Sequence, residues 1–225
     1  MSIFSRLFKK QELPFVPPTP PNHTEIIKPK LQREPLPVNF HLKALVIADT
    51  HGHLSIDENL NLLKEPVDVC LLLGDVSYQE LQYIKDTVKA PIYGVLGNHN
   101  EFGDYEKCGI ENIHGRVIEI NGVRIAGIQG SIRYKKSDLP LYTDEESIEI
   151  ADSMEPADIL ISHDSPKYLY GTHNFAHSGL PGITHYCEKH SVPLNIHGHH
   201  HKSKEHILDN GTKSICVCGV KLIEI

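Results

Sequence analysis

The sequence predicts an α/β fold in which two mixed β-sheets pack face to face with helices outside, a four-layer αββα sandwich. Three observations support this prediction. Short, unbroken apolar runs alternate with helical segments early in the chain, which is typical of parallel strands buried on both faces. The middle carries a hairpin signal at Asn121-Gly122. The end of the chain returns to β-rich segments around a turn at 209–211. Parallel units combined with hairpins indicate mixed sheets.

The 225-residue chain is expected to hold one large domain after a distinct N-terminal segment. Eight of the fifteen prolines fall within residues 1–39. Proline lacks a backbone donor and holds its predecessor in extended conformations, so this segment is predicted to be a flexible, polyproline-like tail before a domain over 40–225. The first ten residues place apolar side chains on one helical face beside basic ones. Two interpretations stay open: an anchor for a membrane surface or a partner, and a frayed terminus.

Composition bounds the class of protein. The five cysteines form no C-x-x-C pair and resemble no disulfide framework, which favours a reducing compartment. No run approaches the roughly 20 apolar residues of a membrane span, and the N-terminus lacks the apolar core of a signal peptide. We therefore expect a cytoplasmic protein. The net charge of -7 argues against an extended nucleic-acid-binding surface.

In the first part of the domain, apolar runs without polar alternation predict strands, and apolar residues at helical spacing predict helices. The strands are expected at 42–48, 67–73 and 91–96, and the helices near 57–64, 78–89 and 101–107. The clearest helix is the second, in which Leu81, Ile84 and Val88 recur at helical spacing.

The second part changes character after the predicted hairpin. The strands are expected at 117–120, 123–128, 158–162, 193–197, 203–208, 212–218 and 220–225, and the helices near 144–154 and 180–190. Thr143 stands three residues before Glu146, the spacing of a capping box, and marks the start of the first of these helices. A loop over 163–178, rich in His, Gly and Tyr, separates two of the strands.

Five of the apolar segments deliver Asp, Asn or His at their C-terminal ends. These residues are Asp49, His51, Asp75, Asn98, His99, His163, His199 and His201. Open α/β sheets bind ligands at this edge. The chain also has sixteen histidines against two methionines and no tryptophan, which favours metal binding. Each fragment alone is unspecific, but the ordered set predicts a metal site.

The ordered motifs resemble those of the calcineurin-like metallophosphoesterase family, in its small single-domain branch. They read Asp49-x-His51, Gly74-Asp75, Gly97-Asn98-His99, His163 and Gly198-His199-x-His201, and the resemblance spans roughly residues 43–225. It implies two metal ions between the sheets. One would be held by Asp49, His51, Asp75 and His201, and the other by Asp75, Asn98, His163 and His199, with Asp75 bridging. It also implies that His99 is the catalytic histidine beside the substrate phosphate.

The resemblance implies hydrolysis of a phosphate mono- or diester by attack of a metal-bound hydroxide. The substrate would be a phosphorylated small molecule or a nucleotide. Imidazole and carboxylate ligands together suit divalent transition-metal ions such as Mn, Fe, Zn or Co. Two further residues are candidates for substrate binding: Arg133, in a Gly-Ser-x-Arg-Tyr block, and His177, on the long loop. For Arg133, an ordinary surface role is equally open.

Two departures from the family pattern concern the surroundings of His99. Asn100 stands where the family usually has an acidic residue, and the second acid that commonly follows Gly-Asp is not found at 77–79. A carboxylate partner raises imidazole basicity, so we expect a changed rate or substrate. The alternative is a non-catalytic scaffold or interaction protein of the same fold. A single structural zinc is disfavoured because no cysteine lies in these blocks.

Overall fold

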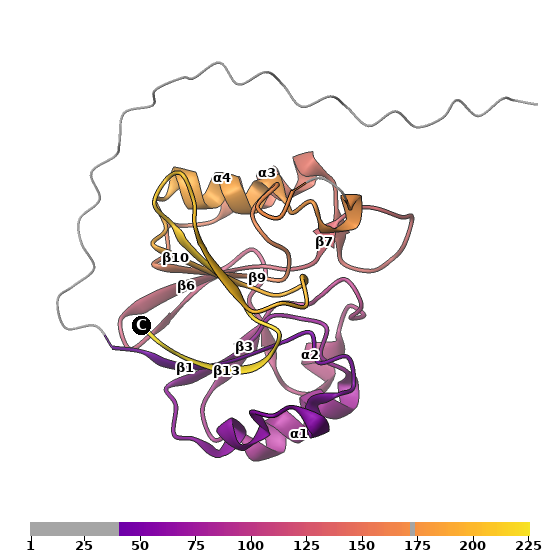
Figure 1. Cartoon of the computed structure of the whole chain (residues 1–225), viewed down its shortest axis with the longest axis vertical. Helices are drawn as coiled ribbons and strands as arrows, with labels where there is room; N and C mark the ends of the chain where they lie inside the picture. The colour runs from indigo at the N-terminus through magenta and orange to yellow at the C-terminus, as the bar shows by residue number, and fades with distance from the viewer. Residues whose placement is uncertain (1–40, 172–173) are drawn as a thin grey trace, which may run out of the picture. The chain divides into compact units, whose positions relative to one another are not determined.

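The computed structural model describes residues 41–171 and 174–225, and it contains the two face-to-face mixed sheets that the sequence predicts (Figure 1). The first sheet has the order β13-β1-β2-β3-β4, formed by Gly219–Glu224, Lys43–Ala48, Val69–Leu72, Ile92–Gly94 and Glu111–Asn112. The second has the order β11-β12-β10-β9-β6-β5, formed by Lys204–Ile207, Lys213–Cys216, Leu194–His197, Ile159–Ser162, Val123–Ile128 and Val117–Ile120. Antiparallel strands β13, β11 and β5 lie at sheet edges beside parallel neighbours.

The predicted hairpin is present, with Ile120 paired to Val123 across the Asn121-Gly122 turn. A third, two-stranded sheet was not predicted. It joins β7 (Ser131–Ile132) and β8 (Leu141–Tyr142) in parallel. Two-residue strands, like β4, are too short to show a period in the sequence.

The helices are α1 (Tyr78–Thr87), α2 (Asp104–Lys107), α3 (Asp144–Ser153) and α4 (Pro181–Lys189), with 3-10 turns η1 (Leu54–Ile56), η2 (Leu60–Lys64) and η3 (Phe175–His177). The expected capping box is confirmed: the Thr143 hydroxyl accepts the Glu146 amide, and the Glu146 carboxylate accepts the Thr143 amide. The helix expected near 57–64 is instead the short turn η2. Asp57 accepts the amides of Asn59 and Val220, and such side-chain bonds compete with helix formation.

Alternating strand residues build three apolar layers. Val46 of the first sheet and Ile161 of the second belong to the cluster between the sheets. Leu45, next to Val46 but on the opposite face, packs in a cluster with Leu81 of α1. The outer face of the second sheet packs on α3 and α4 in the same way (Figure 1). The four-layer αββα arrangement is therefore confirmed.

The predicted tail over 1–39, with its possible N-terminal anchor, lies outside the described residues. Among the helices that the structure describes, none combines the length and the apolar character needed to cross a bilayer.

Candidate metal centre

The predicted ligands lie at one edge of each sheet, where parallel strands end. In the first sheet, β1, β2 and β3 run parallel and lead into Asp49, Asp75 and Asn98. In the second, β9 and β10 run parallel and lead into His163 and His199. The two edges meet, because the His199 amide donates to the Asp49 carboxylate at 2.7 Å. The sandwich thus brings five separate loops together.

The backbone of these loops is unusual. Five predicted metal ligands have positive φ angles: 54° at Asp49, 46° at His51, 54° at Asp75, 70° at His199 and 51° at His201. Such conformations are uncommon for non-glycine residues and cost of order 1–3 kcal/mol each. They persist only where surrounding contacts hold them. Their concentration at one place is typical of a functional site.

Two glycines permit the close approach of these loops. A Cβ atom on Gly97 would collide with the Asp75 carboxylate, and one on Gly74 would collide with the backbone of Gly97. Gly74 also has a φ of 92°, which favours glycine. Gly74 and Gly97 therefore serve to place Asp75 against the loop that carries Asn98.

The inner part of the site is buried and rich in acceptor atoms. Ligand atoms of Asp49, Asp75 and His163 all lie within 4.8 Å of one another. The Nε2 atom of His163 lies 2.8 Å from the Asn98 Oδ1 atom and 3.5 Å from the Asp75 Oδ2 atom. The rings of His163 and His199 are 4.9 Å apart. All five residues are at most 7% exposed.

The outer part of the site is open to solvent. Ligand atoms of Asp49, His51 and His201 lie within 4.8 Å of one another. The Nε2 atom of His51 is 3.3 Å from that of His201 and 3.7 Å from the Asp75 Oδ2 atom. The ring of His99 lies 5.5 Å from that of His51, and His99 is exposed. A ligand can therefore reach the site from the side of the exposed histidines.

Hydrogen bonds orient the buried imidazoles. The Leu73 carbonyl can only accept, so His163 donates to it from Nδ1 at 2.7 Å and presents the Nε2 lone pair to the site. Burial lowers the pKa of His163 to about 4, which keeps the ring neutral near pH 7. Its Nε2 lone pair and the Asn98 Oδ1 atom then face the same space. In His199, Nε2 donates to the Ala176 carbonyl at 2.8 Å, which leaves Nδ1 as the acceptor.

The carboxylates have unmet acceptor capacity. The buried oxygens Asp49 Oδ1 and Asp75 Oδ2 have no hydrogen-bond partner among the described residues. Burial, followed by the nearby charge of Asp75, raises the pKa of Asp49 well above its usual value. Burial acts in the same direction on Asp75, but His163 and the His99 amide outweigh it, so the pKa of Asp75 is lowered. Two buried carboxylates with free oxygens, together with the neutral ring of His163, form a set that fits divalent metal ions.

The structure gives Asn100 a positioning role. Its side chain is buried, and its Oδ1 atom accepts the amides of Asp75 and Gly97, both at 2.9 Å. Its Nδ2 group donates to the Val76 carbonyl at 2.9 Å. No hydrogen bond joins the Asn100 side chain to His99 in the described structure. The residue fastens the Asp75 loop to the Gly97 loop, so its effect on His99 is indirect.

Glu80 is a contributing residue that the sequence analysis did not single out. Its carboxylate accepts from the Thr50 hydroxyl at 2.9 Å and from the amides of Gly52, Leu54 and Ser77 at 3.0, 2.7 and 2.8 Å. It therefore clamps the loop that carries His51. An acid does follow the Gly74-Asp75 motif, one residue past the stretch 77–79. The signal was the spacing Ser77-x-x-Glu80, a capping-box pattern that predicts the local bond and not the long-range ones.

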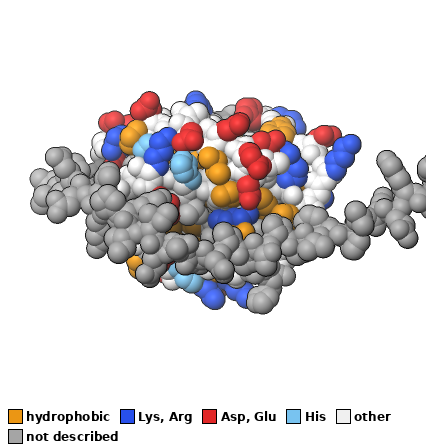
Figure 2. Space-filling view, turned by 90° about the horizontal axis from the view of Figure 1, so that it is seen from above, with side chains coloured by type: hydrophobic (Ala, Val, Ile, Leu, Met, Phe, Trp, Pro, Cys, Tyr) orange, Lys and Arg blue, Asp and Glu red, His pale blue; other side chains and the backbone are white. Residues whose placement is uncertain are grey.

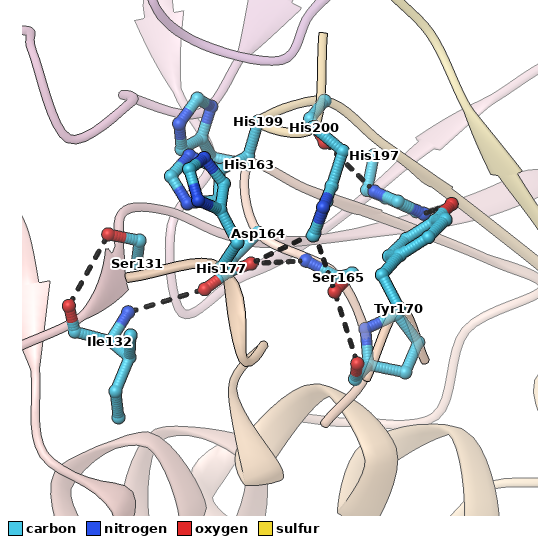
Figure 3. Close-up of polar contacts among 12 residues, drawn as sticks. Ser131, Ile132, His163, Asp164, Ser165, Tyr170, His177, His197, His199 and His200 are labelled. Carbon is cyan, nitrogen blue, oxygen red and sulfur yellow. Dashed lines mark hydrogen bonds and ion pairs between the residues drawn. The ribbon is translucent and has the colours of Figure 1, made fainter. Parts of the chain in front are cut away.

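Asp164 is a second missed residue, directly after His163 (Figure 3). It is fully buried, and its carboxylate accepts the Ser165 amide at 2.8 Å and the Ile132 amide at 3.3 Å. It also lies 3.8 Å from the His200 Nε2 atom. Burial raises the pKa of Asp164, but His199, His200 and the Ser165 amide outweigh it, and the net shift is downward. No sequence pattern separates this aspartate from a surface one.

The two candidates for substrate binding differ in position. Arg133 donates to both oxygens of the Glu146 carboxylate, at 3.0 and 2.7 Å, and to the Leu141 carbonyl. Its guanidinium is thus engaged with α3. His177 stacks on His199, with ring centroids 4.6 Å apart, and so lies beside the predicted ligands. The role of each in substrate binding stays a prediction.

Comparisons with known proteins bear on the family and on the fold of the chain. The family model described as "Calcineurin-like phosphoesterase superfamily domain" matches residues 42–217. An uncharacterised protein of Haemophilus influenzae is 28% identical over 198 residues, which cover 71% of this chain and 83% of that protein.

Solved structures show the same fold. One from Thermus thermophilus has a TM-score of 0.58 at 14% identity and covers 83% of this chain and 99% of that chain. A phosphopantetheinyl hydrolase from Mycobacterium tuberculosis has a TM-score of 0.56 at 14% identity, and the match covers 80% of this chain and 95% of that chain. At this identity, the likeness concerns the fold alone.

Proposed function

The chain belongs to the calcineurin-like phosphoesterase superfamily, and from that premise we propose that it is a dinuclear metal-dependent phosphoesterase. It would hydrolyse a phosphate mono- or diester. The observation that carries the proposal is the pair of buried, unpartnered carboxylate oxygens, Asp49 Oδ1 and Asp75 Oδ2, among the imidazoles of the predicted ligands. Such an arrangement is costly without a cation, since buried acceptors are normally satisfied.

The proposed metal ligands are Asp49, His51, Asp75, Asn98, His163, His199 and His201. Two divalent ions, of Mn, Fe, Zn or Co, would supply Lewis acidity that activates water and polarises a phosphoryl oxygen. The protein prepares the site in advance: the Leu73 and Ala176 carbonyls orient two of the imidazoles, and Glu80 and Asn100 hold the loops.

His99 is the proposed catalytic residue. Its amide donates to the Asp75 Oδ1 atom at 2.9 Å, which fixes its backbone at the edge of the buried carboxylates. Its ring is exposed beside His51, on the open side of the site. From there it can hydrogen-bond a phosphoryl oxygen or donate a proton to the leaving group.

The proposed substrate is a small phosphorylated molecule or a nucleotide. Among the side chains visible in Figure 2, acidic and basic groups are interspersed rather than gathered into one basic track. The net charge of -7 points the same way, because binding along a nucleic acid requires many phosphate contacts.

Metal titration tests the proposal. Chelator-treated protein is supplied with each of the four metals while hydrolysis of p-nitrophenyl phosphate and of bis(p-nitrophenyl) phosphate is followed. We expect metal-dependent turnover that Asp75→Asn abolishes and that His99→Ala lowers by about 10²-fold or more. His185→Ala, a histidine that pairs with Asp152 on α3, is the matched control and should retain activity. Full activity in both site variants would refute the assignment. A protein that takes up no metal would support the non-catalytic alternative.

A further inference from the structure

A pocket of about 260 Å³ lies beside the candidate metal centre. Its lining side chains are those of Tyr170, Asn174, His177, His200, Lys202 and Lys204. Two of them connect it to the predicted ligand His199: the ring of His177 is 4.6 Å from the His199 ring, and that of His200 is 5.6 Å away. The pocket thus begins about one imidazole ring beyond a predicted metal ligand.

The pocket has a positive charge that no described side chain neutralises. Among the described residues no carboxylate lines it, and both lysines are exposed. Neither Lys202 nor Lys204 forms an ion pair with an acidic side chain in the described part of the chain. Lys213, on the neighbouring strand β12, is different, because it pairs with Glu205 at 2.8 Å. Two free ammonium groups beside one cavity attract an anion.

The walls of the pocket are held in place (Figure 3). The ring of Tyr170 packs on that of His200 at 4.0 Å, and the His200 Nε2 atom lies 3.0 Å from the Ser165 hydroxyl. In His177, Nδ1 accepts from the side-chain Nδ2 group of Asn174 at 2.7 Å, so Nε2 carries the proton and remains a donor. A fixed wall with a free donor lowers the entropic cost of holding a ligand.

We propose that this pocket binds a second anionic group, a phosphate or a carboxylate, on the substrate whose scissile phosphoester lies at the metal centre. The inference rests on the proposed function and narrows its substrate class to small phosphoesters with two anionic groups. A simple aryl phosphate leaves the pocket empty. A doubly anionic substrate contacts Lys202 and Lys204 while its phosphoester remains beside His99.

Paired ligands test the pocket by calorimetry on Mn²⁺-supplied protein. The probes are alkane-1,n-diyl bisphosphonates of two to five carbons, each compared with the alkyl monophosphonate of the same length, because their P–C bonds resist the proposed hydrolysis. We expect the best bisphosphonate to bind about tenfold or more tightly than its monophosphonate, since hydrogen bonds to charged groups are among the strong ones. The preference should weaken as salt rises.

The double variant Lys202→Ala/Lys204→Ala should lose this preference and keep its monophosphonate affinity within about twofold. The control Lys85→Ala/Lys89→Ala removes the same charge near the C-terminal end of α1 and just beyond it, and should retain the preference. Equal losses in both double variants, or no preference in the wild type, would overturn the proposal. Hydrolysis of p-nitrophenyl phosphate is measured on the same samples. A preference for the bisphosphonate without hydrolysis of p-nitrophenyl phosphate refutes the proposed function and leaves the pocket assignment standing. Hydrolysis without that preference refutes the pocket assignment.

Discussion

Replacement of Asn100 should destabilise the protein through the loops and not through direct contact with substrate. Asn100→Ala removes one acceptor that serves two amides, those of Asp75 and Gly97, and one donor that serves the Val76 carbonyl. Asn100 is only 4% exposed, so water does not readily replace these hydrogen bonds. Each buried group left unpaired costs about 1–3 kcal/mol. With partial relaxation, the expected loss is about 3–6 kcal/mol.

Asn100→Asp separates the two functions of the side chain. The carboxylate keeps both accepted bonds, but its second oxygen replaces the donor and faces the Val76 carbonyl. Only one of the three bonds is lost, so the expected cost is about 1–3 kcal/mol. For a domain of this size, 1 kcal/mol shifts Tm by roughly 2–4 °C. Asn100→Ala should therefore melt roughly 6–24 °C below the wild type, and Asn100→Asp should melt between the two.

Thermal unfolding with excess chelator measures these effects without a contribution from metal binding. Asn59→Ala is the control, because that side chain is exposed, and surface changes usually stay within about 0.5 kcal/mol. The reasoning fails if Asn100→Ala melts with the control, or if Asn100→Asp is more stable than the wild type. The second result would mean that the donated bond to Val76 contributes nothing.

Four further predictions concern other groups. Asp49→Asn should raise the Tm measured in chelator, because burial and the charge of Asp75 disfavour the ionised Asp49 carboxylate. The same variant should lose most of the stabilisation that added metal gives the wild type. A lower Tm in chelator would contradict the first expectation. Glu80→Ala leaves three backbone amides without their acceptor and should lower the free energy of unfolding by about 3–5 kcal/mol. It should also weaken metal binding, measured by competition with a chelator. Unchanged stability and metal affinity would show that the clamp on the His51 loop is dispensable. Burial lowers the pKa of His114 to about 4, so the stability that the neutral ring contributes is present above pH 6.5 and is lost as pH falls toward 4. His114→Asn should reduce the change in the free energy of unfolding between pH 6.5 and pH 4 by at most about 3 kcal/mol. An unaltered pH dependence of stability in this variant would contradict the prediction. A chain that starts near Asn39 should keep its metal content and aryl phosphate turnover, since residues 1–39 hold no proposed ligand, and loss of either would show that the segment supports the domain.

Local patterns in the sequence determined where many of the strands and helices form and at which edge of the sheets the candidate metal ligands lie. Continuous apolar runs marked β1, β2 and β9, because strands buried on both faces are rich in apolar residues. Asn121-Gly122 specified a hairpin, since its turn requires positive φ angles, which were found at both residues. The order of Asp, Asn and His after the strands identified the residues that could hold metal. Each of these signals depends on neighbours a few positions apart.

Only the tertiary structure decided how those residues work together. The bond between the His199 amide and Asp49 joins positions 150 residues apart, and no local pattern encodes it. The same holds for Glu80 on the His51 loop, for Arg133 on Glu146, and for the Asp75 amide that Asn100 accepts. The cause is physical: alternation and spacing report which face of an element a residue occupies, whereas these contacts join loops and helices that only the folded chain brings together.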